Sequence, residues 1–270
     1  MIVKKRAFLE TAVKAAKLAG DYLVSNLGKV SHKDITHKQA SDFVTRVDRE
    51  SEQIILAAIR KDFPDHLFLT EESVHDSETG HYRWIIDPLD GTTNFIHRYP
   101  FFSVSIALQY GGEIILGVIY DPLRDELYSA VKGKGAYCNK TRARVSPCGS
   151  LRDSLITTGF PFRNREMLDP YLKLFKNIFL KVSDLRRAGS AAMDLANLAC
   201  GRCDGFFEIA LSPWDIAAGA ILIEEAGGIV TDFRGSRAFL SSGNIVAGNP
   251  AIQKELLREV KNVFRGIIVE

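Results

Sequence analysis

The sequence has little net charge, few cysteines and no long apolar run, and each shortage narrows what the protein can be. Its net charge is +2, so no basic field indicates nucleic acid or a membrane as the main partner. No apolar segment is long enough to span a bilayer. The first residues, MIVKKRAFLE, lack the apolar core and cleavage site of a secretory leader. We therefore expect a cytoplasmic protein with no membrane partner.

The sequence contains four cysteines. Cys200 and Cys203 have the spacing of a redox motif or of half a zinc site. No second pair of cysteine or histidine residues lies nearby at ligand spacing, and the preceding residues 191–199 have a helical pattern that ends at Gly201. We interpret these cysteines as buried or idle thiols, with a disulfide left open for a hyperthermophilic source.

The chain has the length and composition of an ordinary globular protein. It has 270 residues, of which 46% are hydrophobic and 25% charged. This is enough for one large domain or for two closely packed halves with a substantial core. No repeat, low-complexity tract or flexible linker interrupts it. The composition turns polar around 146–153, where we place the boundary between an N-terminal half of about 1–148 and a C-terminal half of about 149–270.

Hydrophobic periodicity predicts two helices and a mostly antiparallel sheet in the N-terminal half. The helices are expected at 6–27, where Gly28 ends the first, and at 46–62, where Thr45 caps the second. Between them lies a polar loop, 31–42, that is long enough to cover a site. The expected strands are 66–73, 84–90, 101–110, 113–121 and 126–139, with a hairpin turn at Gly111-Gly112.

The C-terminal half alternates between strand and helix patterns. Helices are expected at 165–180, 190–201, 213–228 and 251–264. Strands are expected at 155–160, 184–189, 203–210, 227–233 and 244–249. Helices that bury one face against a sheet stack in layers, so we predict an α+β fold, a layered αβαβα sandwich with two sheets between helix layers.

The segment WIIDPLDGTTNF, residues 84–95, is the most informative part of the chain. An apolar run brings Asp87 and Asp90 to a tight turn. Two such aspartates can bind one hard cation, with the Leu89 carbonyl as a third oxygen ligand. The N–H groups and hydroxyls of residues 91–93 then suit a phosphate oxygen. The alternative is a buried strand that ends in an ordinary Asp-Gly turn.

A second acidic position, Asp215, lies near the start of a predicted helix in the segment PWDIAAG. The helix dipole favours a carboxylate there, so capping alone would explain it. The small residues 217–219 that follow permit the close approach of another element. If the two halves meet face to face, Asp215 could join Asp87 and Asp90.

Taken together, these segments resemble the inositol monophosphatase family, which belongs to a larger group of lithium-sensitive, magnesium-dependent phosphatases. The signature segments are WIIDPLDGTTNF and WDIAAGAILIEEAGG, and DFVTRVD at 42–48, EES at 71–73 and RRAGSAA at 186–192 also occur in the family's order. The resemblance covers essentially the whole chain. It implies a single domain over 1–270 with a sandwich of the sugar-phosphatase type.

The resemblance implies that two or three Mg²⁺ ions are held by Glu71, Asp87, the Leu89 carbonyl, Asp90 and Asp215. The residue types agree, because Mg²⁺ takes oxygen ligands, and carboxylates without a histidine or cysteine argue against zinc. Clustered carboxylates raise one another's pKa values and destabilise a metal-free site, and a divalent cation reverses that penalty.

The resemblance also implies catalytic roles. Thr92 resembles the family's threonine that acts with an aspartate, here Asp48, to activate a metal-bound water, and Glu71 orients that water or its ion. In-line attack expels the alcohol without a phosphoenzyme. For Asp48 the alternative is a solvated residue on an amphipathic helix. Lys38 resembles a loop lysine that approaches metal and phosphate, and Lys33 fits that position as well.

The expected substrate-binding residues lie on both halves of the chain: Gly91, Thr92, Thr93, Gly189, Ser190, Ala191, Glu208 and Asp215. Glu208 lies seven residues before Asp215, as in the family. Its carboxylate suits the hydroxyls of a polyol, and the alternative is a surface residue at a strand end. Arg186 and Arg187 would line a subunit contact or bind a second phosphate.

We therefore predict magnesium-dependent hydrolysis of myo-inositol 1-phosphate to myo-inositol and phosphate. Lithium inhibition is implied by the family. One alternative is fructose-1,6-bisphosphatase activity, alone or as a dual activity, which the loop before Asp48 and the arginines 163, 165 and 186 would decide. An alternative of another class is a regulatory protein that binds the transcription machinery and ribosomal RNA. The family is commonly dimeric, and the phenylalanines at 160–162 and 206–207 fit either an interface or the core.

Overall fold

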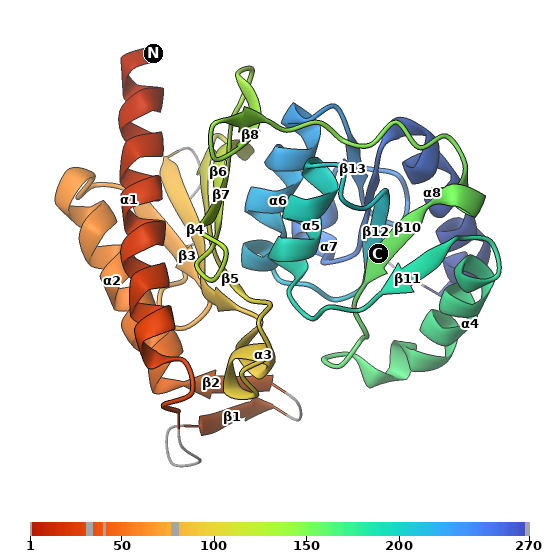
Figure 1. Ribbon diagram of the computed structural model, residues 1–270, viewed down its shortest axis with the longest axis horizontal. Helices are drawn as coiled ribbons and strands as arrows, with labels where there is room; N and C mark the ends of the chain where they lie inside the picture. Colours follow the sequence, from red (N-terminus) through yellow and green to blue (C-terminus); the bar gives the residue numbers. More distant parts are fainter. Residues whose placement is uncertain (1, 31–34, 40–41, 77–80, 268–270) are drawn as a thin grey trace.

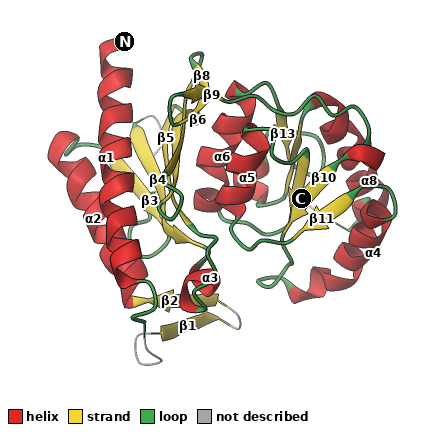
Figure 2. Ribbon diagram, in the orientation of Figure 1, coloured by secondary structure: helices red, strands yellow, loops and turns green. Residues whose placement is uncertain are grey.

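The computed structural model in Figure 1 describes residues 2–30, 35–39, 42–76 and 81–267. Its layers follow the order helices, sheet, helices, sheet, helices (Figure 2), which confirms the predicted α+β sandwich. The first helix layer consists of α1 (Ile2–Asn26) and α2 (Arg46–Asp62). The middle layer consists of α5 (Ala191–Ala199) and α6 (Pro213–Glu225), and the last layer of α4 (Leu168–Phe179) and α8 (Pro250–Phe264). None of the described helices combines the length and apolarity that a membrane span requires.

The first sheet is antiparallel except for its edge pair β3–β4. Its order follows the chain: β3 (Leu67–Thr70), β4 (Tyr82–Asp90), β5 (Ser103–Tyr110), β6 (Glu113–Asp121), β7 (Glu126–Val131), β8 (Gly135–Cys138) and β9 (Thr141–Arg142). The hairpin between β5 and β6 turns at Gly111-Gly112, as predicted, and both glycines have left-handed φ angles.

The segment predicted as a polar loop contains a two-stranded hairpin instead, formed by β1 (Ile35–Gln39) and β2 (Asp42–Thr45). Its strands are short and carry no alternation of apolar and polar residues, so the sequence offers no strand signal. The predicted cap of α2 is confirmed. The Thr45 hydroxyl accepts a hydrogen bond from the Val47 N–H at 3.0 Å, and the Asp48 carboxylate accepts one from the Thr45 N–H at 2.8 Å.

The second sheet has the order β11-β10-β12-β14-β13 and mixes parallel with antiparallel pairs. Its strands are β10 (Leu155–Thr158), β11 (Asp184–Arg186), β12 (Gly205–Glu208), β13 (Ile229–Thr231) and β14 (Ile245–Gly248). The chain passes from the first sheet to the second through the polar stretch after β9, which includes a 3₁₀ turn, η2 (Leu151–Asp153). The short helix α7 (Phe239–Ser242) was not predicted.

Helix α6 lies in the middle layer and contacts both the first sheet and α5 at very short range. A Cβ atom added to Gly117 of β6 would lie 2.9 Å from the Cα of Ala218, and one added to Gly219 would lie 2.4 Å from the Cβ of Leu195. Only glycine fits at these two contacts. The predicted close approach at residues 217–219 is therefore confirmed, and it fixes the start of α6 against the first sheet.

All four cysteines are free; Cys203 is buried and the other three are partly buried, which agrees with the interpretation as buried or idle thiols. Phe206 and Phe207 are fully buried and belong to the core rather than to an interface. Phe162 differs from them, because 45% of its surface is exposed.

Candidate active site

Asp87 and Asp90 lie at the end of β4, where its register with β5 shifts. Asp87 pairs with Ser105 and Asp90 with Ser103, so β4 has one more residue than β5 between these pairs. In a regular strand, residues three apart point to opposite faces, and the extra residue of a bulge brings them back to one face. The predicted turn between the two aspartates is therefore a bulge within a strand.

The chain turns one residue later, at Gly91. Its φ is +96°, and an added Cβ would lie 3.1 Å from the carbonyl oxygen of Phe101 and 3.3 Å from that of Gly189. Both the backbone conformation and the lack of space require glycine here. The short helix α3 (Thr92–Ile96) follows, so that Thr92 and Thr93 come to line the same pocket as the aspartates.

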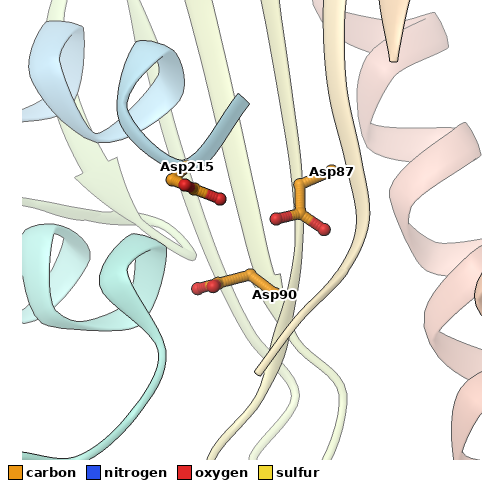
Figure 3. A group of neighbouring side chains, drawn as sticks. All are labelled: Asp87, Asp90 and Asp215. Atoms are coloured by element: carbon orange, nitrogen blue, oxygen red, sulfur yellow. The ribbon is translucent and has the colours of Figure 1, made fainter. Parts of the chain in front are cut away.

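Asp215 enters the site from the first turn of α6. One of its oxygens accepts the Ser212 N–H at 2.7 Å in a capping box, so the capping interpretation is correct. Asp215 is also part of an acidic cluster. One carboxylate oxygen from each of Asp87, Asp90 and Asp215 lies within 4.8 Å of the other two (Figure 3). The predicted convergence of the two halves on these three aspartates is confirmed.

The three aspartates are buried, and their environment disfavours negative charge. Burial raises the pKa of Asp87 well above its usual value, and the charges of Glu71, Asp90 and Asp215 raise it further. Burial and the charge of Asp215 raise the pKa of Asp90 to about 7. Burial also raises the pKa of Asp215, although the nearby Arg163 opposes this. A divalent cation would relieve this repulsion.

Hydrogen bonds hold the aspartates in place. The Ser190 hydroxyl and the Ala192 N–H both donate to Oδ2 of Asp90, the latter at 2.8 Å. The Leu89 N–H donates to Oδ1 of Asp87 at 2.9 Å. Ser190 also caps α5, because its side-chain oxygen accepts the Met193 N–H. Ser190 therefore lines the pocket with its side chain already engaged by Asp90.

Glu71 follows β3 and lines the same pocket, but it stands apart from the three-aspartate group. Arg163 lies between them. Its Nη1 is 3.3 Å from Oδ2 of Asp215, and its Nη2 is 4.0 Å from Oε1 of Glu71. The sequence placed Arg163 among the arginines that would select a substrate, and it did not indicate this pairing with the acidic cluster.

Asp48 reaches the site through Thr92. The Thr92 hydroxyl donates to Oδ1 of Asp48 at 2.8 Å and lies 3.2 Å from the Leu89 carbonyl oxygen. Asp48 is fully buried and does not line the pocket, so the interpretation as a solvated helix residue is wrong. Burial raises the pKa of Asp48, and its hydrogen bonds with Thr45 and Thr92 oppose that rise.

The pocket beside the aspartates has a volume of about 370 Å³ and contains residues from both halves of the chain. All of the expected substrate-binding residues line it: Gly91, Thr92, Thr93, Gly189, Ser190, Ala191, Glu208 and Asp215. Glu208 is not the surface residue of the alternative interpretation. Its carboxylate lies against Gly159, where an added Cβ would be 1.9 Å from Oε1 of Glu208.

Eight further residues line the pocket without having been predicted to bind substrate: Thr158, Gly159, Phe160, Phe162, Asp194, Ile209, Ala210 and Leu211. Arg187, predicted to line a subunit contact or to bind a second phosphate, lines the pocket as well. Asp194 could have been suspected, because it is the one charged residue in the run Ala191–Ala199. Arg186 lies outside the pocket, where it is exposed and pairs with Asp184. Lys33 lies outside the described residues, and the side chain of Lys38 is likewise not described.

Comparison with known proteins agrees with this geometry. A sequence model of the inositol monophosphatase family matches residues 4–264. The chain is 46% identical to the Nus factor SuhB of Escherichia coli (strain K12) over 255 residues, which is 94% of this chain and 96% of that protein. Among solved structures, the extragenic suppressor protein suhB from Bartonella henselae has a TM-score of 0.89 at 44% identity and covers 94% of this chain and 98% of its own.

A second solved structure, the Thermotoga maritima IMPase, has a TM-score of 0.88 at 36% identity and covers 97% of this chain and all of its own. Both structures extend the match over nearly the full length of the chain, including the two halves that supply the aspartates. The chain therefore belongs to the inositol monophosphatase family.

Proposed function

We propose that the protein is a Mg²⁺-dependent phosphatase that hydrolyses myo-inositol 1-phosphate to myo-inositol and phosphate. The observation that carries this proposal is the convergence of Asp87, Asp90 and Asp215, with oxygens within 4.8 Å, beside the N–H groups and hydroxyls of residues 91–93. Three oxygen donors with no histidine or cysteine among them fit a hard cation and not zinc.

In this proposal Glu71, Asp87, the Leu89 carbonyl, Asp90 and Asp215 would hold two or three Mg²⁺ ions. Bound Mg²⁺ supplies Lewis acidity, which lowers the pKa of water and offsets the charge of the phosphoryl oxygens. The raised pKa values of Asp87 and Asp90 support the assignment, because they arise from burial and from repulsion between carboxylates that a bound cation would relieve.

The chain's own contribution to proton transfer is assigned to Asp48 and Thr92. Since the Thr92 hydroxyl donates its proton to Asp48, its lone pairs are free to accept a proton from a water in the pocket. As it does so, the Thr92 hydroxyl passes its own proton to Asp48, which becomes neutral, and the water becomes the attacking hydroxide. Its burial, which raises its pKa, strengthens it as a base.

Phosphate release from inositol 1-phosphate, measured with and without Mg²⁺, tests the proposal. We expect activity that EDTA abolishes and that added Mg²⁺ restores, and we expect Asp90→Asn to lack it. Activity that is unaffected by EDTA, or retained in Asp90→Asn, would refute the mechanism.

Fructose-1,6-bisphosphatase activity is a second candidate, which the two pocket arginines Arg163 and Arg187 favour as partners for a second phosphate. The ratio of kcat/KM for fructose 1,6-bisphosphate and inositol 1-phosphate separates the two candidates.

A regulatory role is a candidate of another class, favoured by the name Nus factor that the E. coli relative carries. In this role the protein would associate with the transcription machinery. A pull-down with RNA polymerase, repeated with Asp90→Asn, tests it. Binding that persists in the inactive variant would show a role separate from catalysis, and no binding by either form would remove the candidate.

A homodimer is also part of the proposal, supported by exposed apolar residues on and next to α4. These residues are Phe162, Leu168, Leu172, Phe179 and Leu180. Sedimentation of the wild type and of Phe179→Asp tests it, with a shift toward monomer expected for the variant.

A further inference from the structure

Two further carboxylates that line the pocket accept no hydrogen bond from the residues that the structure describes. Asp194 lies on α5 with 3% of its surface exposed, and Glu208 lies at the end of β12. Both line the pocket. Neither side chain accepts a hydrogen bond or forms an ion pair with any residue in the described part of the chain. Burying a carboxylate without a donor is costly, so a ligand is expected to supply the donors.

The neighbouring buried carboxylates, in contrast, do have hydrogen-bond donors. Asp90 is held by Ser190 and Ala192, and Asp215 by Ser212 and Arg163. Asp48 likewise accepts hydrogen bonds, including the 2.8 Å bond from Thr92. The missing donors are therefore specific to the side of the pocket formed by Asp194 and Glu208.

The positive charge of Arg187 acts on the carboxylates of Asp194 and Glu208, but its guanidinium forms no hydrogen bond or ion pair with either. Its guanidinium carbon lies 5.1 Å from the centre of the Phe162 ring and 6.0 Å from that of Phe160, which holds it by cation–π contacts. Burial raises the pKa values of Asp194 and Glu208, and the charges of nearby carboxylates raise them further: Asp90 acts on Asp194, and Asp194, Asp215 and Asp90 act on Glu208. The charge of Arg187 opposes both rises. With one cation facing two carboxylates, this side of the pocket has more acceptors than donors, and neutral hydroxyl groups can supply the missing donors.

We infer that Asp194 acts with Glu208 to bind the hydroxyl groups of the substrate's alcohol, which makes Asp194 a specificity-determining residue. The inference rests on the proposed phosphatase function and adds a residue, Asp194, that would contact the alcohol part of the substrate. A polyol supplies donors to both carboxylates, whereas a phenol leaves both unpaired after desolvation.

The test compares kcat/KM at saturating Mg²⁺ for inositol 1-phosphate, a ring-deoxy analogue series and phenyl phosphate. We expect Asp194→Ala to lower the ratio of inositol 1-phosphate to phenyl phosphate activity by about 10- to 100-fold, the usual cost of losing a hydrogen bond to a charged group. One deoxy analogue should be discriminated against by the wild type and not by the variant. Effects on metal binding act on all substrates and cancel in the ratio.

Asp232→Asn is the matched control, because Asp232 is an equally buried carboxylate outside the pocket whose oxygens accept bonds from Ser236 and from the Arg234 N–H. It should leave the substrate ratio unchanged. Asp194→Asn provides a second variant of similar volume in case the alanine variant fails to fold, which thermal denaturation would reveal.

The outcomes separate the inference from the function on which it rests. If the wild type hydrolyses neither inositol 1-phosphate nor phenyl phosphate with Mg²⁺, the proposed function fails. If it hydrolyses them and the ratio is unchanged in Asp194→Ala and Asp194→Asn, the role of Asp194 is overturned. A higher kcat/KM for an amino-sugar phosphate than for inositol 1-phosphate would also overturn it, because the two carboxylates would then bind an ammonium group.

Discussion

The Thr92 hydroxyl donates a 2.8 Å hydrogen bond to the Asp48 carboxylate, which joins α3 to the first turn of α2 across 44 residues of sequence. The other oxygen of Asp48 accepts the Thr45 N–H and hydroxyl at 2.8 and 2.6 Å. One buried carboxylate thus caps a helix and orients the threonine that faces the pocket. Asp48 therefore contributes both to the stability of the fold and to the proposed proton transfer, and substitutions can separate the two effects.

Asp48→Asn is expected to lower kcat by about 10²- to 10⁴-fold, the usual contribution of a general base. Thr92→Val should lose a similar factor and Thr92→Ser should retain most activity, because only the serine keeps the hydroxyl. Thr45→Ala is the comparison: it removes the cap, at a cost of about 1 kcal/mol, and one hydrogen bond to Asp48, but it leaves the Thr92–Asp48 bond, so kcat should fall much less. Steady-state kinetics and urea denaturation check this, and an active Asp48→Asn enzyme would contradict it.

The metal-free protein is expected to lose stability as the pH rises from about 4 to about 7. The pKa of Asp90 is raised from 3.8 to about 7 by folding. Between these values the folded state holds a proton that the unfolded state has lost, so unfolding becomes easier as the pH increases, by at most about 1.4 kcal/mol per pH unit. Thermal denaturation in EDTA measures this slope.

Two comparisons assign that slope to the aspartates. Mg²⁺ should flatten or reverse it, because a bound cation stabilises the ionised carboxylates. Asp90→Asn should also flatten it, because the variant has no proton to lose at this position. A slope that is the same in the wild type and in Asp90→Asn would place its origin elsewhere.

Arg163→Gln is expected to bind Mg²⁺ more tightly and to be less stable without metal. Arg163 compensates the charges of Asp215 and Glu71 in the metal-free protein, so a metal ion must compete with it. Isothermal titration and the rise in Tm with Mg²⁺ measure both effects. Arg152→Gln, at the 3₁₀ turn η2, is the charge-matched control. Weaker Mg²⁺ binding by Arg163→Gln would show instead that Arg163 orients Asp215.

Gly91→Ala and Gly111→Ala separate backbone strain from damage to the site. Both glycines have left-handed φ angles, +96° and +58°, so each substitution should cost roughly 1–2 kcal/mol of stability. Only the Cβ at position 91 meets neighbours, at 3.1 Å from the Phe101 carbonyl oxygen, while position 111 opens to space. Gly91→Ala should therefore also displace Thr92 and lower kcat. Equal activity of the two variants would contradict this.

Much of the fold could be predicted because long elements carry a strong periodic signal. The helices α2 and α8, the hairpin at Gly111-Gly112 and the caps at Thr45 and Ser190 all follow from local patterns. The hairpin β1–β2 and the helices α3 and α7 could not be predicted, because four or five residues are too few to show a period. Their existence depends on contacts with the rest of the chain.

The candidate site, like the fold, could be predicted from the sequence only in part. Its acidic segment was evident from Asp87 and Asp90, but the bulge that turns both to one face depends on the pairing with β5. Asp194 was missed although it is the one charged residue in the run Ala191–Ala199, because only the folded chain places it at the pocket. Arg163 was noticed as a charge, whereas its position between Glu71 and Asp215 depends on three separate elements.

By itself, the sequence determined which chemical groups are available: oxygen ligands for a hard cation, a glycine turn with hydroxyls for a phosphate, and helices and strands to carry them. Only the tertiary structure decided which groups meet. Asp215 joins Asp87 and Asp90 because Gly117 lets α6 lie directly against the first sheet. The raised pKa values and the carboxylates without donors follow from burial, which arises only when distant segments exclude water together.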